Sequence, residues 1–182
     1  MNSEGPSALE QEAMAAYREK RLGAAEQAFA AARQKYSEVG ERAKAAEMAN
    51  NLCVVLLDAG QPQRALEAVL PTVEVFGELK DRLHLAQAFG NLASAQEACG
   101  KTAEAEASYR KAAETFAAIG DKDNRAHCLK ALSQLQLRHG RHLEAAVSMQ
   151  AALDSQQKPG VMSRLLRWLL RLLSRLLGWP AG

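Results

Sequence analysis

The sequence predicts an all-α protein, an α-solenoid of about four helix-turn-helix repeats followed by a C-terminal amphipathic helix. The first observation is a heptapeptide pattern that returns every forty residues, as Tyr36–Arg42, Phe76–Arg82 and Phe116–Lys122. The second is a set of turn glycines at the same interval, Gly60, Gly100 and Gly140. A period of this size indicates stacked helix pairs, because one pair cannot bury its apolar face alone.

The composition also favours helices over a sheet. Hydrophobic residues make up 48% of the 182 residues and aromatic residues only 5%, and alanine is frequent. This balance suits closely packed helices. The length allows one modest domain with a continuous core.

The formal net charge of +2 is unevenly distributed along the chain. Residues 161–182 hold four arginines and no acidic residue, so the other 19 basic and 21 acidic groups give residues 1–160 a net charge of −2. A repeat body with a slight acidic excess is not expected to bind nucleic acid.

The helices can be placed in order. We expect residues 1–6 to be disordered and Ser7 to cap a first helix that ends near Lys20, because a serine hydroxyl can accept a backbone N–H of the first turn. A second helix is expected from Leu22 to about Tyr36, and Gly40 supplies the left-handed conformation that ends it. Three further pairs are expected at residues 42–59 with 62–77, 82–99 with 102–118, and 122–139 with 142–155. The repeat units therefore span about 7–39, 42–79, 82–119 and 122–157 of a domain that covers residues 7–157.

Two positions depart from the pattern. Pro71 lies inside the fourth helix, where it should remove the hydrogen bond to the Glu67 carbonyl and kink the helix. Lys80 occupies the place that Gly40 and Gly120 have in other repeats, so its turn is either built differently or strained.

The third and fourth pairs share one arrangement of bulky and small residues. In the third pair it consists of Phe89, Leu92, Ala93, Gly100, Ala105, Tyr109 and Ala112. In the fourth pair it consists of Leu129, Leu132, Ser133, Gly140, Ala145, Met149 and Ala152. The first pair keeps only Ala25, Phe29 and Ala32. With this arrangement, residues 8–155 resemble the tetratricopeptide repeat family.

The forty-residue period looks more like the longer repeats of kinesin light chains, spindle-orientation adaptors and bacterial regulator proteins. This resemblance implies a right-handed solenoid that acts as a non-enzymatic adaptor or scaffold. It would bind a peptide or protein partner in a concave groove lined by the first helix of each pair. The resemblance also implies that an asparagine before the conserved aliphatic residue contacts peptide backbone, which applies here to Asn51 and Asn91.

The chemistry of these asparagines agrees with that implication. A side-chain amide carries both a donor and an acceptor and can bridge the unpaired groups of an extended peptide. Helical periodicity completes the candidate groove as Asn50, Asn51, Val54, Asp58, Gln87, Asn91, Ser94, His127, Lys130, Gln134 and Arg138. The alternative interpretation is that these are solvated polar positions between helices.

A different pattern follows the break at residues 158–160. Residues 161–178 place arginines on one side of a helix and leucines on the other, and the last residues, 179–182, form a short tail. The apolar runs are too short to cross a bilayer but are typical of a helix in its interface, with arginines among anionic headgroups. The expected membrane-binding residues are Arg164, Leu165, Arg167, Trp168, Leu169, Arg171, Leu172, Arg175 and Leu176.

Other functions of this Arg/Leu segment remain open. It could cap the solenoid by folding over Leu135, Val147 and Met149, or pair with a second copy and make a soluble homo-oligomeric scaffold. A helix of this composition could also permeabilise a bilayer. The membrane-surface interpretation is favoured because every charge of the segment is positive.

The sequence contains no recognisable catalytic or metal-binding motif. Cys53, Cys99 and Cys128 lack CxxC spacing, and His139 and His142 flank a turn glycine, so we expect no metal, no cofactor and no enzymatic activity. Unpaired cysteines fit a reducing compartment, and the N-terminus lacks the pattern of a signal peptide. The expected location is therefore cytoplasmic, with peripheral association at the inner face of a membrane.

Overall fold

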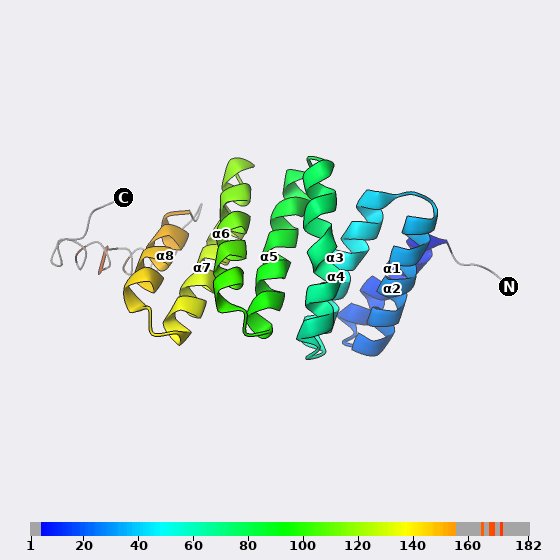
Figure 1. Cartoon of the computed structure of the whole chain (residues 1–182), viewed down its shortest axis with the longest axis horizontal. Helices are drawn as coiled ribbons and strands as arrows, with labels where there is room; N and C mark the ends of the chain where they lie inside the picture. Colours follow the sequence, from blue (N-terminus) through cyan, green and yellow to red (C-terminus); the bar gives the residue numbers. More distant parts are fainter. Residues whose placement is uncertain (1–4, 156–164, 166–167, 170–171, 173–182) are drawn as a thin grey trace. The chain divides into compact units, whose positions relative to one another are not determined.

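The computed structural model describes residues 5–155 together with Leu165, Trp168, Leu169 and Leu172 (Figure 1). Within these residues every regular element is an α-helix, which confirms the predicted all-α repeat class. The helices are α1 (Pro6–Arg18), α2 (Leu22–Glu38), α3 (Arg42–Asp58), α4 (Pro62–Glu78), α5 (Arg82–Ala98), α6 (Thr102–Ala118), α7 (Lys122–Arg138) and α8 (His142–Ser155). Their ends lie within two residues of the predicted ones.

The start of α1 differs from the prediction. Gly5 is the residue that precedes the helix, Pro6 is the first helical residue, and no side chain caps the first turn. Ser7 therefore lies inside the helix, and the predicted Ser7 cap is wrong. Proline suits the first position because its missing N–H would have no partner within the helix in any case.

Contacts between Cα atoms divide the chain into two compact units, Met1–Ser108 and Tyr109–Gly182, and each is described by itself. In the first unit each helix from α1 to α4 packs on the next, and α3 also contacts α5. Its core is apolar, with the largest fully buried side chains at Phe29, Phe76, Met48 and Leu56.

In the second unit α7 packs on α8. Two buried hydroxyls join these helices. Ser133 donates to the Ala145 carbonyl at 2.7 Å, and Ser148 donates to Oε1 of Gln136 at 2.8 Å. Because their partners are buried too, these bonds remove a desolvation penalty that either group would otherwise suffer.

Every helix from α1 to α7 ends in the same way. The residue two positions beyond each helix has a positive φ, and these residues are Lys20, Gly40, Gly60, Lys80, Gly100, Gly120 and Gly140. The following residue donates its backbone N–H to the carbonyl five positions earlier, as Asp81 does to Phe76 at 3.0 Å. This six-residue closure is the Schellman arrangement, and it satisfies carbonyls that the helix end leaves unpaired. The spacing of twenty residues is therefore fixed by a turn after each helix.

The turn at Lys80 thus has the same hydrogen bonds as the others, and the backbone of Lys80 is strained. Lys80 has φ of 56° and Lys20 has φ of 59°, in the left-handed region where a side chain is unfavourable. Of the two alternatives that the sequence left open for Lys80, the structure shows the strained one.

Pro71 lies within α4 without ending it, since the helix continues to Glu78. Next to it, the buried Thr72 hydroxyl donates to the Val69 carbonyl at 2.7 Å. One helix turn thus contains a residue that cannot donate its N–H and a side chain that adds a bond to a nearby carbonyl.

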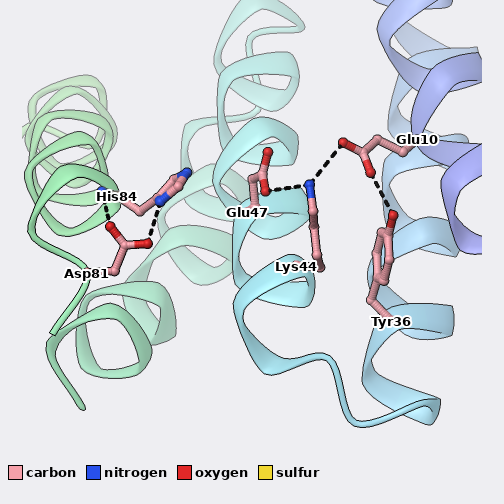
Figure 2. A network of polar contacts seen from close by, with 6 residues as sticks. All are labelled: Glu10, Tyr36, Lys44, Glu47, Asp81 and His84. Atoms are coloured by element: carbon pink, nitrogen blue, oxygen red, sulfur yellow. Dashed lines mark hydrogen bonds and ion pairs between the residues drawn. The ribbon is translucent and has the colours of Figure 1, made fainter. Parts of the chain in front are cut away.

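Two first helices carry an aspartate cap. Asp81 accepts the backbone N–H of His84 at 3.1 Å and lies 2.6 Å from its ring Nδ1 (Figure 2). Asp121 accepts the backbone N–H of Asn124 at 3.0 Å and its side-chain amide at 2.7 Å. Partial burial raises the pKa of Asp81, but the hydrogen bonds from His84 outweigh this and hold that pKa below its usual value. Both sites are reciprocal caps in which the N3 side chain returns to the cap residue.

The strain at Lys80 predicts that Lys80→Gly stabilises the protein. Glycine adopts the left-handed conformation without a steric penalty, so the free energy of unfolding should rise by about 0.5–1 kcal/mol, as read from urea denaturation. Gly40→Lys is the reverse control and should lower it by a similar amount. An unchanged or lower stability of Lys80→Gly would show that the lysine is not strained.

Candidate functional site

The predicted groove residues of the first unit come from α3 and α5, and these helices stack in register. Nδ2 of Asn91 lies 3.0 Å from Oδ1 of Asn50, to which it donates a hydrogen bond, and 3.5 Å from the Asn50 backbone carbonyl. The backbone carbonyl of Asn91 faces the Cys53 thiol at 3.9 Å. Residues about forty positions apart are therefore neighbours, as the sequence period implies.

This contact leaves Asn50, Asn51 and Asn91 with different hydrogen-bonding groups available to a ligand. Asn91 uses its amide donor inside the protein and keeps Oδ1 for a ligand, whereas Asn50 is buried, with 5% of its surface exposed. Asn51 is half-buried and has no hydrogen-bond partner among the residues that the structure describes. Of the three, only Asn51 retains both an unpaired donor and an unpaired acceptor.

The remaining groove positions of the first unit are more exposed or less polar. Val54 and Ser94 are half-buried and Gln87 is exposed. The Ser94 hydroxyl donates to the Gly90 carbonyl at 3.1 Å within its own helix. Asp58 accepts a 2.9 Å hydrogen bond from the Tyr17 hydroxyl and pairs with Lys20 at 3.6 Å.

The structure adds α1 to this surface, which the sequence analysis missed. A surface pocket of about 450 Å³ is lined by Ser7, Glu10, Gln11, Met14, Arg18, Tyr36 and Lys44. The five α1 residues are the forty-residue equivalents of Glu47, Asn50, Asn51, Val54 and Asp58. The signal was therefore present, because subtracting one period from the α3 positions gives the α1 residues. We call the α1, α3 and α5 positions together the groove face of the first unit.

Three of the lining residues, Glu10, Tyr36 and Lys44, belong to a polar network (Figure 2). The buried Tyr36 hydroxyl donates to Oε2 of Glu10 at 2.7 Å, and Nζ of Lys44 lies 3.6 Å from Oε1 of Glu10 and 3.0 Å from Oε2 of Glu47. The hydrogen bond to Glu10, with burial, raises the pKa of Tyr36. The hydrogen bond to Glu47 and the two carboxylate charges raise the pKa of Lys44 despite partial burial. The network therefore joins α1 to α3, and its two carboxylates share one ammonium group.

The predicted groove residues of α7 belong to the second unit. His127 and Gln134 are exposed and Lys130 is half-buried, and Arg138 ends the helix. They follow one face of α7 by helical spacing. This face contains two cationic side chains, Lys130 and Arg138, whereas the α3 and α5 positions are mainly amides.

Four of the predicted membrane-binding residues are described. Leu165, Trp168, Leu169 and Leu172 are helical, with 50%, 60%, 41% and 41% of their surfaces exposed. Arg164, Arg167, Arg171, Arg175 and Leu176 lie outside the described residues, as does the predicted break at residues 158–160. Among described helices, none is long and apolar enough to cross a membrane.

The cysteines are placed as small packing residues. Cys53 and Cys128 are buried and Cys99 is half-buried, and all three are free thiols. Burial raises the pKa of Cys53 to about 12 and that of Cys128 to about 11, which disfavours the reactive thiolate. Within the described part of the chain, no three His, Cys, Asp or Glu side chains gather as metal ligands would.

Known proteins with a similar sequence pattern or a similar fold support the helical-repeat architecture. A family model described as tetratricopeptide repeat matches residues 84–158. The apo form of RapI has a TM-score of 0.71 at 15% identity, over 90% of this chain and 47% of RapI. BtubC (BKLC) from P. vanneervenii has a TM-score of 0.58 at 15% identity, over 97% of this chain and 92% of BtubC. No curated protein sequence matches the chain.

At 15% identity these likenesses show the fold alone, and the chain spans only 47% of the length of RapI. The family model adds sequence evidence for the third and fourth helix pairs. The resemblance predicted from the sequence is thereby confirmed: residues 84–158 match the tetratricopeptide repeat model, and the described helices before them form helix pairs of the same kind.

Proposed function

We propose that the protein is a non-enzymatic cytoplasmic adaptor that binds an extended peptide or protein partner on its groove face and associates with an anionic membrane surface through its C-terminal segment. Tetratricopeptide repeats mediate protein–protein interactions, which gives the first half its general basis. The partner and the membrane contact are inferred from the residues of this chain.

The observation that carries the peptide-binding half is the half-buried amide of Asn51, which has no partner among the described residues. A partly desolvated amide gains when a ligand supplies both a donor and an acceptor, and an extended peptide backbone does so at alternate residues. The amide nitrogen of Asn91 donates to Asn50, the residue before Asn51. The Oδ1 atom of Asn91 therefore offers a second acceptor to a ligand. Such contacts bind a peptide strand with little dependence on its sequence.

The exposed apolar face of the C-terminal segment supports the membrane half. Leu165, Trp168, Leu169 and Leu172 follow the i, i+3, i+4, i+7 spacing of one helix face, and each has at least 41% of its surface exposed. In a cap that covered the last helix pair, these side chains would be dry. Insertion of a leucine into the apolar layer contributes about 1.5–3 kcal/mol, and each nearby arginine about 1 kcal/mol on an anionic surface.

The distribution of charge along the chain also supports membrane association through the C-terminal end. Residues 109–182 contain 12 basic and 5 acidic residues, whereas residues 1–108 contain 11 basic and 16 acidic residues. Anionic lipid would therefore attract the second unit and repel the first at distances within the Debye length. Such a molecule would approach the bilayer by its C-terminal unit and leave its N-terminal groove face to the partner.

Asn51→Ala should weaken partner binding and leave folding unchanged, because its amide has no bond to lose among the described residues. We expect less partner in affinity capture from native lysate and a free energy of unfolding within about 0.5 kcal/mol of the original. Asn50→Ala is the matched control, since it removes the 3.0 Å hydrogen bond from Asn91 and leaves Nδ2 of Asn91 only its 3.5 Å contact with the backbone carbonyl of residue 50. It should lower stability by about 1 kcal/mol. If Asn51→Ala retained every captured partner, the groove assignment would be wrong.

Tryptophan fluorescence can test membrane association selectively, because Trp168 and Trp179 are the two tryptophans of the chain. Vesicles of 30% phosphatidylserine should shift the emission to the blue and co-sediment with the protein, and salt should weaken both effects. Leu169→Glu with Leu172→Glu should abolish the shift.

Two results would oppose the membrane assignment. One is emission that vesicles do not change. The other is a stable oligomer in light scattering without lipid that becomes monomeric when residues 161–182 are deleted, which would assign the leucine face to self-association instead.

A further inference from the structure

We infer that the pocket beside α1 selects a carboxylate on the bound peptide, with the Arg18 guanidinium as its contact. The inference rests on the proposed peptide-binding function and adds a specificity to it. It concerns only α1, the end of α2 and the start of α3, where the pocket of about 450 Å³ lies. This volume falls within the range of about 300–1,000 Å³ that small-ligand sites occupy.

The unpaired hydrogen-bonding groups of the pocket are mostly donors. Both oxygens of Glu10 are engaged, one by the Tyr36 hydroxyl and the other by Lys44. Lys44 is shared between Glu10 and Glu47, which leaves about one of its three N–H groups for a ligand. Arg18 and Gln11 have no hydrogen-bond or ion-pair partner among the described residues. A ligand must therefore supply acceptors.

The charge of the pocket determines whether a charged or a neutral acceptor of the ligand is preferred. Within the lining the single charges of Glu10 and Lys44 offset each other, and Glu47, which is not a lining residue, also pairs with Lys44. Arg18 is therefore the cation of the described lining without a paired carboxylate. A guanidinium presents a planar fork of N–H donors that matches a carboxylate with two parallel hydrogen bonds. A neutral side-chain amide could accept only one such bond and brings no charge.

The spacing along α1 indicates how a peptide would lie. Gln11, Met14 and Arg18 share one face at i, i+3 and i+7. Seven helical residues span about 10 Å, which equals roughly three residues of extended chain. Gln11 can therefore bind a backbone amide, Met14 can contact an apolar side chain, and Arg18 can reach an acidic group about three residues further along.

Synthetic tetrapeptides and the full-length chain test this inference. The probes are acetyl-Ala-Ala-Ala-Glu-amide, its neutral analogue acetyl-Ala-Ala-Ala-Gln-amide, and acetyl-Ala-Ala-Ala-Ala with a free carboxylate end. Titration is followed by backbone amide chemical shifts of residues 11–18 at neutral pH. We expect the Glu peptide to bind about two- to fivefold more tightly than the Gln peptide, the range that an exposed ion pair contributes. The third peptide shows whether a side-chain or a chain-end carboxylate is preferred.

Arg18→Gln should abolish the difference between the Glu and Gln peptides and leave weak binding of both. Arg33→Gln is the matched control, because Arg33 is exposed on α2, is absent from the pocket lining and has no partner in the described part of the chain. Equal binding of the Glu and Gln peptides, or a difference that survives Arg18→Gln, would overturn the inference. Should either occur while Asn51→Ala still reduces partner capture, the proposed groove would stand and only its acidic selectivity would be lost.

Discussion

A residue in the left-handed conformation at every twentieth position is the constraint on which the rest of this structure depends. From position 20 to position 140 each of these residues has a positive φ, and the next residue closes a hydrogen bond to the carbonyl five positions earlier at 2.8–3.0 Å. The turn leaves room for helices of 17 residues from α2 to α7. Two helices and two turns then give forty residues, so side chains one period apart lie beside each other on consecutive first helices.

This register decides what the groove face can do. It brings Asn91 to Asn50 and leaves Asn51 with an amide that no described residue binds. On α1 the same positions carry Glu10, Gln11 and Arg18, so a surface that is mainly amide on α3 and α5 becomes charged at its first helix. A repeat of constant geometry thus presents different chemistry at each step, and the difference lies in the side chains rather than in the backbone. Partner selectivity would follow from that sequence of side chains.

Much of the fold could be predicted from the sequence because glycine marks five of the seven turns. The helix ends followed from those glycines and from the forty-residue repetition of aromatic and small residues. The turns at Lys20 and Lys80 could not be predicted from the local sequence, since the backbone of a lysine rarely adopts a positive φ. Only the surrounding helices, which impose the same closure, determine their conformation.

The site was predicted in part, for physical reasons. Helical spacing places Asn50, Asn51 and Asn91 on neighbouring positions, but it cannot tell which amide donates to which, because that depends on side-chain rotamers and on the approach of α3 to α5. The α1 pocket was missed because Lys20 follows α1 in the place of the turn glycines Gly60, Gly100 and Gly140, which marked the other first helices. Its groove residues become evident only when the period of α3 is extended backwards by forty residues.

Hydrogen exchange at the closing amides tests the central claim most directly. The backbone N–H groups of Arg21 and Asp81 each donate to the carbonyl five positions earlier, although both follow a lysine with positive φ. The account predicts that these two amides exchange as slowly as those of Glu41 and Asp121, which follow a glycine. Exchange of Arg21 and Asp81 at the rate of an unprotected peptide would contradict a common turn, and with it the register that arranges the groove face.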